Sequence, residues 1–339
     1  MENNLEITIG IPVYHVEKYI EKSLKSALNQ DFKLPYEIIV VDDRGTDGSM
    51  ELVKQIVESH ERGEIVRIIR HEENKGLGEA RNTIIRNAKG KYLYFLDSDD
   101  WMFDNALSVL YEEAEKSQAE ITCGSTQQKM ELTGKQAIYF QYAGGVYEHE
   151  AVGAWMIAHG IWIATTAWNK LYRMDFIRKY DIHTIHRITE DQWLSYTSWL
   201  YARKIALVSQ ITMCYNIRES SIMYSIHGRQ GSEDTIIICC EIINKLFHLI
   251  QEKFQKVSGA YDLYYKAIRA NMAILQSSLY SDEQLVRMSV LLRHVAIRVP
   301  SMFALCQRRN RFIYLCSKIY DRAFTFCSYD RLYCKWFSK

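Results

Sequence analysis

The sequence predicts an α/β fold with a mostly parallel sheet flanked by helices, followed by an all-helical C-terminal extension. Strand-like and helix-like patterns alternate four times in the first 120 residues, as in a parallel sheet covered by helices. The run Glu37–Val41 is continuously apolar after its first residue, which is typical of a strand buried on both faces. Beyond about residue 231 the pattern becomes nearly all helical.

Each element of the first part follows from its periodicity. The expected strands are Ile7–Val13, Glu37–Val41, Ile65–Ile69 and Tyr92–Leu96. The expected helices between and after them are Val16–Gln30, Ser49–Ser59, Leu77–Ala88 and Ala106–Lys116. The three prolines of the chain interrupt few of these elements.

The alternation weakens after Ile121–Cys123. We expect a hairpin formed by Gln136–Tyr142 and Gly145–Tyr147, and two short strands, Ile205–Val208 and Thr212–Ile217, around a turn. Helical spacing marks the segments Val152–His159, Asp191–Ala202, Thr235–Phe254, Tyr261–Leu279, Asp282–Val299 and Met302–Tyr320. The polar stretch His227–Ser232 is the best boundary, which divides the chain into domains 1–228 and 229–339.

Charge is distributed unevenly along the chain. The total is +1, from 42 basic and 41 acidic residues, which argues against a uniformly basic nucleic-acid-binding protein. The last 55 residues hold eleven Lys or Arg and two Asp, a charge of +9, so the rest carries −8. This aromatic-rich tail is predicted to dock on an anionic membrane surface or on the acidic domain, and the sequence leaves both open.

The N-terminus is polar and acidic, unlike a signal peptide, and no apolar run reaches the length of a membrane span. Eight dispersed cysteines without a CxxC pair indicate reduced thiols. We therefore expect a cytoplasmic protein that is peripheral on the inner face of the cell membrane.

Acidic residues follow the predicted strands at the edge where ligands bind to open parallel sheets. Asp42 and Asp43 end the second strand, and Asp97, Asp99 and Asp100 follow the fourth. Clustered carboxylates repel one another, so they indicate a bound cation, and Mg²⁺ or Mn²⁺ prefers such oxygen ligands. For Asp47 and Asp104, which precede helices, capping is the better interpretation. The turn after the first strand has neither the Gly-x-Gly-x-x-Gly of a dinucleotide site nor a P-loop.

Five segments in order resemble the signatures of the family 2 glycosyltransferases, inverting enzymes with the GT-A fold. They are Ile-Gly-Ile-Pro-Val-Tyr (9–14), Val-Val-Asp-Asp with Thr-Asp-Gly-Ser (40–49), Asn-Lys-Gly-Leu-Gly-Glu-Ala-Arg-Asn (74–82), Leu-Asp-Ser-Asp-Asp (96–100) and Thr-Glu-Asp-Gln (189–192). The resemblance covers about residues 5–225. Two departures, His15 in place of the usual Asn and Arg44-Gly45 in place of Gly-Ser, lie at the nucleotide end.

The resemblance implies transfer of a sugar from a nucleoside diphosphate, favoured as UDP, to a saccharide or lipid-linked saccharide in cell-surface polysaccharide synthesis. Asp191 is the implied catalytic base, and Asp99, Asp97 and His227 the implied ligands of Mn²⁺ or Mg²⁺. The implied nucleotide-sugar pocket comprises Pro12, Tyr14, Glu17, Asp42, Asp43, Asn74, Gly76, Arg81, Asp97 and Ser98. Residues expected near the donor or acceptor sugar are Trp168, Asn169, Lys170, Glu190 and Arg218.

Two alternatives stay open at this point. A nucleotidyltransferase also uses an α/β sheet and acidic metal ligands, but it requires a Gly-rich, basic loop after the first strand, where this chain has Tyr14 and Glu17. A non-catalytic nucleotide-sugar-binding protein would bind the nucleotide with metal and transfer nothing.

Overall fold

The structure is a computed structural model that describes residues 5–185, 189–218 and 233–276. These residues fall into two compact units. The first unit contains the described residues up to 153 and those from 163 to 218; the second contains 154–162 and 233–276. The predicted boundary at 228/229 and the predicted helices beyond 276 lie outside the described residues.

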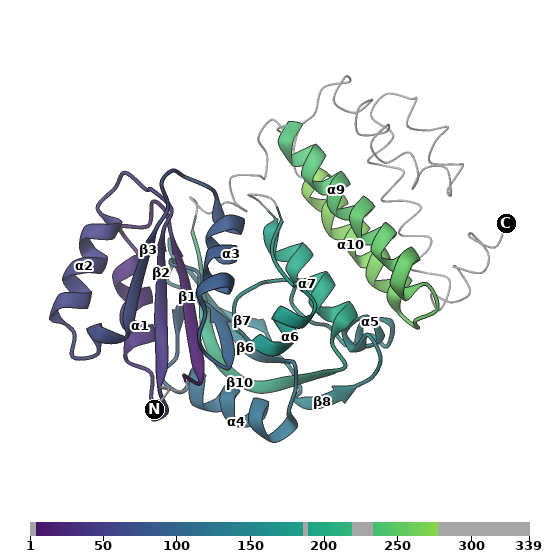
Figure 1. Cartoon of the computed structure of the whole chain (residues 1–339), viewed down its shortest axis with the longest axis horizontal. Coiled ribbons are helices and arrows are strands. Elements are labelled where there is room, and N and C mark those ends of the chain that lie inside the picture. Colours follow the sequence, from purple (N-terminus) through teal and green to yellow (C-terminus); the bar gives the residue numbers. More distant parts are fainter. Residues whose placement is uncertain (1–4, 186–188, 219–232, 277–339) are drawn as a thin grey trace. The chain divides into compact units, whose positions relative to one another are not determined.

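The first unit begins with four strand–helix pairs, as predicted. The strands are β1 (Ile7–Val13), β2 (Tyr36–Asp42), β3 (Val66–Arg70) and β4 (Tyr92–Phe95), and the helices α1 (Ile20–Leu28), α2 (Ser49–Ser59), α3 (Leu77–Asn87) and α4 (Ala106–Ser117). A short 3₁₀ turn, Gly63–Ile65, precedes β3. Figure 1 shows this half with its strands side by side and helices on both faces.

Burial explains why these segments form strands. All seven residues of β1 and of β2 are buried, because helices cover both faces of the sheet. Helix α3 approaches β1 closely at Gly10, where an added Cβ atom would lie 2.3 Å from Cγ2 of Ile84. Gly10 therefore allows the tight packing that brings the start of α3 to the ligand-binding edge of the sheet.

The remaining strands extend the sheet, which is parallel from β3 to β4 and mixed beyond. The additional strands are β5 (Trp101–Met102), β6 (Ile121–Met130), β7 (Gln136–Phe140), β8 (Gly145–Glu148), β9 (Lys170–Arg173) and β10 (Lys204–Ile217). The order is β3-β2-β1-β4-β9-β6-β10-β5, with β7 paired to β6 and β8 to β10. Helices α5 (Val152–Ala158), α6 (Met174–Lys179) and α7 (Glu190–Tyr201) complete this part of the chain.

Two predictions for this half are wrong, and one strand was not predicted. The segments expected to form one hairpin do not pair with each other: β7 pairs with β6 and β8 with β10, both antiparallel. The two short strands expected at 205–217 are one strand, β10, whose register shifts at Val208–Met213. The chain after Trp168 forms an unpredicted strand, β9, which inserts antiparallel between β4 and β6.

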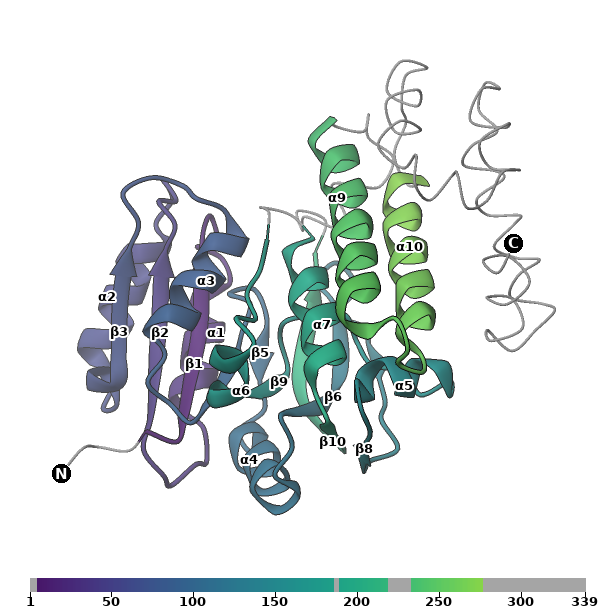
Figure 2. The ribbon, with the colours of Figure 1, turned by 45° about the vertical axis from the view of Figure 1, so that its right-hand side comes forward.

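The second unit consists largely of two helices that pack on each other, α9 (Glu233–Leu249) and α10 (Ala260–Gln276), as Figure 2 shows. A π-helical turn, Ile250–Phe254, extends α9. Cys239, Cys240, Ile243 and Leu246 are among the buried residues of α9. Within the described part of the chain, no helix has the length and apolar character needed to cross a bilayer.

Candidate functional site

The carboxyl ends of β1, β2 and β4 meet at one edge of the sheet. In the register, Val13 lies beside Asp42, and Gly10 beside Phe95. The chain leaves β1 toward β2 on one side and returns to β4 on the other, so a topological switch point lies between β1 and β4. This is where ligands bind in open α/β sheets.

The loop after β1 is bonded to the loop after β2. The backbone N–H of Glu17 donates to Asp47 (3.0 Å), and the Glu17 carboxylate accepts from the N–H of Gly48 (3.0 Å). His15 Nε2 accepts from the N–H of Thr46 (3.0 Å). Tyr14, whose side chain is 47% exposed, stacks on the ring of His15 with a centroid separation of 4.2 Å. Pro12 is buried in β1 directly before this loop.

Both departures from the family pattern lie at unusual backbone positions. His15 has φ 52° and Arg44 φ 64°, in the left-handed region that favours Asn and Gly. The left-handed backbone therefore explains why the family usually has Asn and Gly where this chain has His15 and Arg44.

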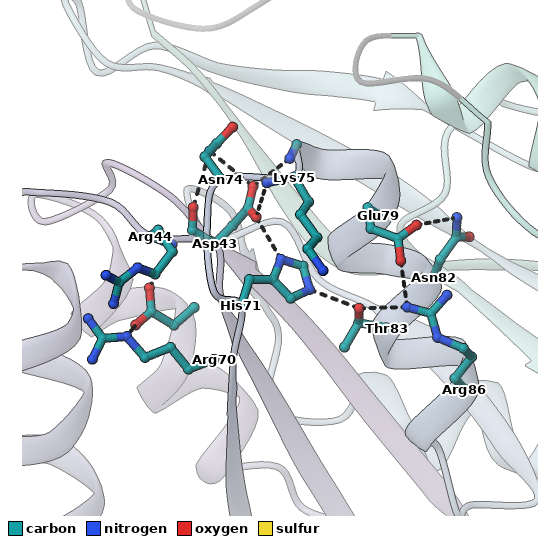
Figure 3. Close-up of polar contacts among 12 residues, drawn as sticks. Asp43, Arg44, Arg70, His71, Asn74, Lys75, Glu79, Asn82, Thr83 and Arg86 are labelled. Carbon is teal, nitrogen blue, oxygen red and sulfur yellow. Dashed lines mark hydrogen bonds and ion pairs between the residues drawn. The ribbon is translucent and has the colours of Figure 1, made fainter.

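Asp43 fixes the loop that precedes α3 (Figure 3). Its Oδ1 lies 2.7 Å from Nδ1 of His71 and accepts from the N–H of Lys75 (2.8 Å). Its Oδ2 accepts from Nδ2 of Asn74 (3.1 Å) and the N–H of Gly76 (2.8 Å), where φ is 88°. These four contacts occupy the acceptor positions of a buried carboxylate. Asp43 therefore holds the loop that precedes α3 in place.

Asp42 also has two partners within the protein. Its Oδ1 accepts from the N–H of Arg44 (2.9 Å), and its Oδ2 lies 3.1 Å from Nε of Arg70. The Arg70 side chain is 64% exposed, so this pair lies at the solvent boundary.

Sequence reasoning missed His71 and Thr184. His71 is buried and links Asp43 to the Thr83 hydroxyl (Nε2 to Oγ1, 2.9 Å). Thr184 is held by Asn82, which accepts its N–H (2.9 Å) and donates to its carbonyl (3.0 Å). For His71 a signal existed, because it directly follows a strand, as the acids do.

Arg81 joins the two acidic motifs. Its guanidinium donates to Asp97 (Nη2 to Oδ1, 2.5 Å) and to Glu190, and its side chain is 2% exposed. Although burial alone would lower the pKa of Arg81, the carboxylates Asp97, Glu190 and Asp191 raise it. Arg81 therefore forms an internal bridge between the chain after β4 and the start of α7, and its place in the nucleotide pocket stays a prediction.

Asp191 lies in an environment that raises its pKa. It is half-buried in the first turn of α7, and burial, reinforced by Glu190, raises its pKa to about 7. Arg81 and Lys170 oppose that rise. A carboxylate with a pKa near neutrality can accept a proton at physiological pH and release it again.

Asp99 is paired with Arg218. Nε of Arg218 lies 2.6 Å from Oδ2 of Asp99, and its guanidinium carbon lies 4.7 Å from the centre of the Tyr19 ring. Tyr19 in turn donates to the Glu131 carboxylate (3.0 Å). Burial raises the pKa of Asp99, while Arg218 opposes the rise.

The neighbours of Asp99 are buried. One oxygen of Asp100 accepts from the N–H of Asn216 (2.8 Å), and the other has no hydrogen-bond partner in the described structure. Burial raises the pKa of Asp100 well above its usual value. Ser98 is 7% exposed.

The carboxylates present suit a hard divalent cation whose coordination shell is completed by substrate oxygens. Among the described residues no group of three or more His, Cys, Asp or Glu could hold a metal, and His227 lies outside them. Asp97 and Asp99 provide two carboxylates at one strand end. Mg²⁺ is commonly held by one or two carboxylates together with substrate phosphates, so the residues present fit that arrangement.

The segment Trp168–Lys170 is packed in the interior. Trp168 is 5% exposed, and Asn169 bonds both Gly124 O (2.8 Å) and Thr212 Oγ1 (2.6 Å). Nζ of Lys170 donates to Thr166 Oγ1 (3.0 Å), and burial lowers its pKa to about 8. This arrangement favours structural roles for Trp168 and Asn169, and for Lys170 an electrostatic role beside Asp191.

Comparison with known proteins agrees with the geometry. The model of the family described as "Glycosyl transferase family 2" matches residues 8–179. Glycosyltransferase GlyA of Streptococcus pneumoniae is 32% identical over 64% of this chain and 31% of its own length. The poly(ribitol-phosphate) beta-glucosyltransferase of Bacillus spizizenii is 29% identical over 66% of this chain and 34% of its own length. The match therefore spans about a third of these two relatives.

A solved structure supports the predicted fold class. Residues 1–349 of S. aureus TarS superpose with a TM-score of 0.65 at 18% identity, covering 94% of this chain and 92% of that one. This likeness confirms the GT-A-type fold.

Proposed function

The chain belongs to glycosyl transferase family 2, and from that premise we propose that it is an inverting glycosyltransferase. It moves a sugar from a nucleoside diphosphate sugar, with UDP favoured, to a saccharide or lipid-linked saccharide of the cell surface. One observation carries the proposal: Asp191, with its pKa raised to about 7, adjoins Glu190, which Arg81 joins to Asp97 of the Asp-x-Asp motif.

The chemistry follows from two requirements. The acceptor hydroxyl must lose its proton as its oxygen attacks C1 of the donor sugar, and Asp191 takes that proton. The bond from C1 to the diphosphate oxygen breaks, and its electron pair leaves with the diphosphate. Attack from the face opposite the leaving group inverts the configuration at C1.

The departing diphosphate gathers negative charge. Arg218, which now pairs with Asp99, provides a cation close to that charge. Asp97 and Asp99 would hold Mg²⁺ or Mn²⁺, which when bound neutralises charge on the diphosphate. Glu190 stays paired with Arg81 and maintains the acidic environment of Asp191.

The nucleotide occupies the switch point between β1 and β4. Tyr14 offers an exposed ring to the base, while Asp43 holds the Asn74–Gly76 loop that forms one wall. Pro12, Glu17, Asp42 and Ser98 line or support the same edge. Support for UDP comes from S. aureus TarS, whose structures include complexes with UDP and UDP-GlcNAc.

The acceptor and the location are also proposals. Relatives named as poly(ribitol-phosphate) glycosyltransferases and a chondroitin synthase support a polysaccharide acceptor. The +9 segment 285–339 is proposed to keep the enzyme on the anionic inner face of the cell membrane.

A donor screen tests the proposal. The full chain is incubated with UDP- and GDP-sugars and Mn²⁺, and nucleotide release is measured. We expect release from a UDP-sugar, and a loss of at least about a hundredfold in Asp191→Asn and in Asp99→Asn. Asp181→Asn is the matched control, since that side chain is 95% exposed. Binding of UDP without any release by the wild type would instead identify a non-catalytic binding protein.

A further inference from the structure

Four aromatic rings form a closed cluster on β7, β10 and the chain before β9. Tyr139 lies 4.0 Å from Phe140 and 5.2 Å from Tyr215, measured between ring centroids. Trp168 lies 6.2 Å from Phe140 and 5.6 Å from Tyr215. Strand β6 pairs with β7 on one side and with β10 on the other, and these strands appear together in Figure 1.

A β-bulge produces the cluster. Thr126 of β6 is opposite Phe140, but the next residue, Gln127, is opposite Ile138, so Tyr139 is the extra residue of β7. Consecutive side chains of a regular strand point to opposite faces, and their rings cannot touch. The bulge turns Tyr139 and Phe140 toward each other, and such re-aiming of a side chain is frequent beside active sites.

Exposure increases across the cluster from the core to solvent. Trp168 is 5% exposed, Phe140 and Tyr215 are half-buried, and Tyr139 is 40% exposed. Buried rings thus support one ring that is open to solvent. A rigid, partly exposed aromatic ring offers a large contact area at a small cost in conformational entropy.

The cluster lies on strands that follow β4 in the sheet order, on the other side of β4 from β1 and β2. Asp100 interacts electrostatically with both Tyr139 and Tyr215, and Asp97 and Asp99 also act on Tyr215. In the sheet order, the nucleotide-side strands β2 and β1 precede β4, whereas β6 and β10 follow it. Asp97 and Asp99 at the end of β4 therefore separate the cluster from Tyr14.

We propose that Tyr139, supported by Phe140, Tyr215 and Trp168, is a stacking surface for a sugar ring of the acceptor. The apolar C–H face of a pyranose packs on the exposed ring, while its hydroxyl groups remain in water or bond to polar side chains. This inference rests on the proposed function.

Saccharide binding tests the stacking surface directly. Saturation-transfer NMR with N,N′-diacetylchitobiose and maltotriose is applied to the wild type, Tyr139→Ala, Tyr139→Phe and Ile138→Ala. Ile138 is the matched control, an apolar neighbour that is 58% exposed and outside the ring cluster. UDP-sugar hydrolysis is measured in parallel to report on the donor site.

We expect at least one saccharide to bind the wild type, and Tyr139→Ala to weaken it about tenfold, as loss of a stacked ring implies. Tyr139→Phe and Ile138→Ala should stay within about twofold, and donor hydrolysis should be unchanged in all variants. Equal binding by Tyr139→Ala, binding of neither saccharide by the wild type, or a parallel loss of donor hydrolysis would overturn the inference. A further outcome separates the two proposals. If the wild type binds a saccharide that Tyr139→Ala does not bind, but hydrolyses no nucleotide sugar, the proposed function fails and the stacking surface is supported.

Discussion

Arg81 lies 2.5 Å from Asp97 (Nη2 to Oδ1) and at the same time donates to Glu190, so one buried cation joins residues 97 and 190. Both partners belong to acidic motifs that are far apart in the sequence. Because Asp191 follows Glu190 directly, this bridge sets the position of Asp191, the proposed base, relative to Asp97.

Removal of that bridge should destabilise the fold. Arg81→Met leaves the buried Glu190 and the partly buried Asp97 without their cation, so the free energy of unfolding should fall by about 3–5 kcal/mol. Urea denaturation followed by circular dichroism measures the loss in the free energy of unfolding. Arg86→Met is the control, because Arg86 is 57% exposed in its pair with Glu79 and should cost less than about 1 kcal/mol. Equal losses in the two variants would contradict the bridge.

Transfer should depend on pH through Asp191. The base works only when deprotonated, so kcat/KM should rise as pH increases through about 7. Glu190→Gln removes a negative charge that raises the Asp191 pKa, and the acidic limb should move to lower pH. A rate profile that is flat between about pH 6 and 8 in the wild type would contradict this assignment.

Asp191→Asn should stabilise the protein at alkaline pH. The folded pKa of about 7 exceeds the unfolded value of about 3.9, so the folded state binds more protons between them. The free energy of unfolding of the wild type therefore falls as pH rises from about 4 to about 7. Asp191→Asn has no ionisable group at this position and does not lose this stability. Differential scanning fluorimetry should give a higher Tm for the variant above pH 7 and equal Tm values near pH 4. A variant that melts lower at pH 8 would show that the carboxylate is stabilising.

Arg218 should compete with a divalent cation for Asp99. In Arg218→Gln the carboxylate loses its paired cation, so Mn²⁺ should bind the donor-free protein more tightly. Titration with Mn²⁺ followed by electron paramagnetic resonance measures this affinity without any turnover. Lys25→Gln, which disrupts an exposed pair with Glu21, should leave Mn²⁺ affinity unchanged. If Arg218→Gln binds Mn²⁺ with unchanged affinity, Asp99 is not a ligand of the metal.

The parallel half of the fold was predictable because its signals are local. The strand Ile7–Val13 and the helix Ser49–Ser59 have the bounds that periodicity predicts. The hairpin error has a physical cause: Gly144-Gly145 is a strong turn signal, but strand pairing depends on distant partners, here β6 and β10. Strand β9 was missed because four residues, Lys170–Arg173, carry too little periodicity.

The candidate site also has a part that could be predicted from the sequence and a part that could not. Acids at the ends of β2 and β4 could be read from the sequence, since parallel strands end at one edge. Their partners could not, because the approach of α3 to β1 at Gly10 and the position of α7 decide that Arg81 bridges Asp97 and Glu190. Tyr139 was likewise hidden, since a bulge rather than strand alternation directs its ring.

The stereochemistry of donor hydrolysis tests the central claim most directly. With an α-linked UDP-sugar and water as acceptor, proton NMR during the first minutes identifies the anomer that is released before mutarotation. Attack assisted by Asp191 from the opposite face predicts the β-anomer from the wild type and no measurable release from Asp191→Asn. Initial release of the α-anomer, or normal turnover by Asp191→Asn, would contradict the account.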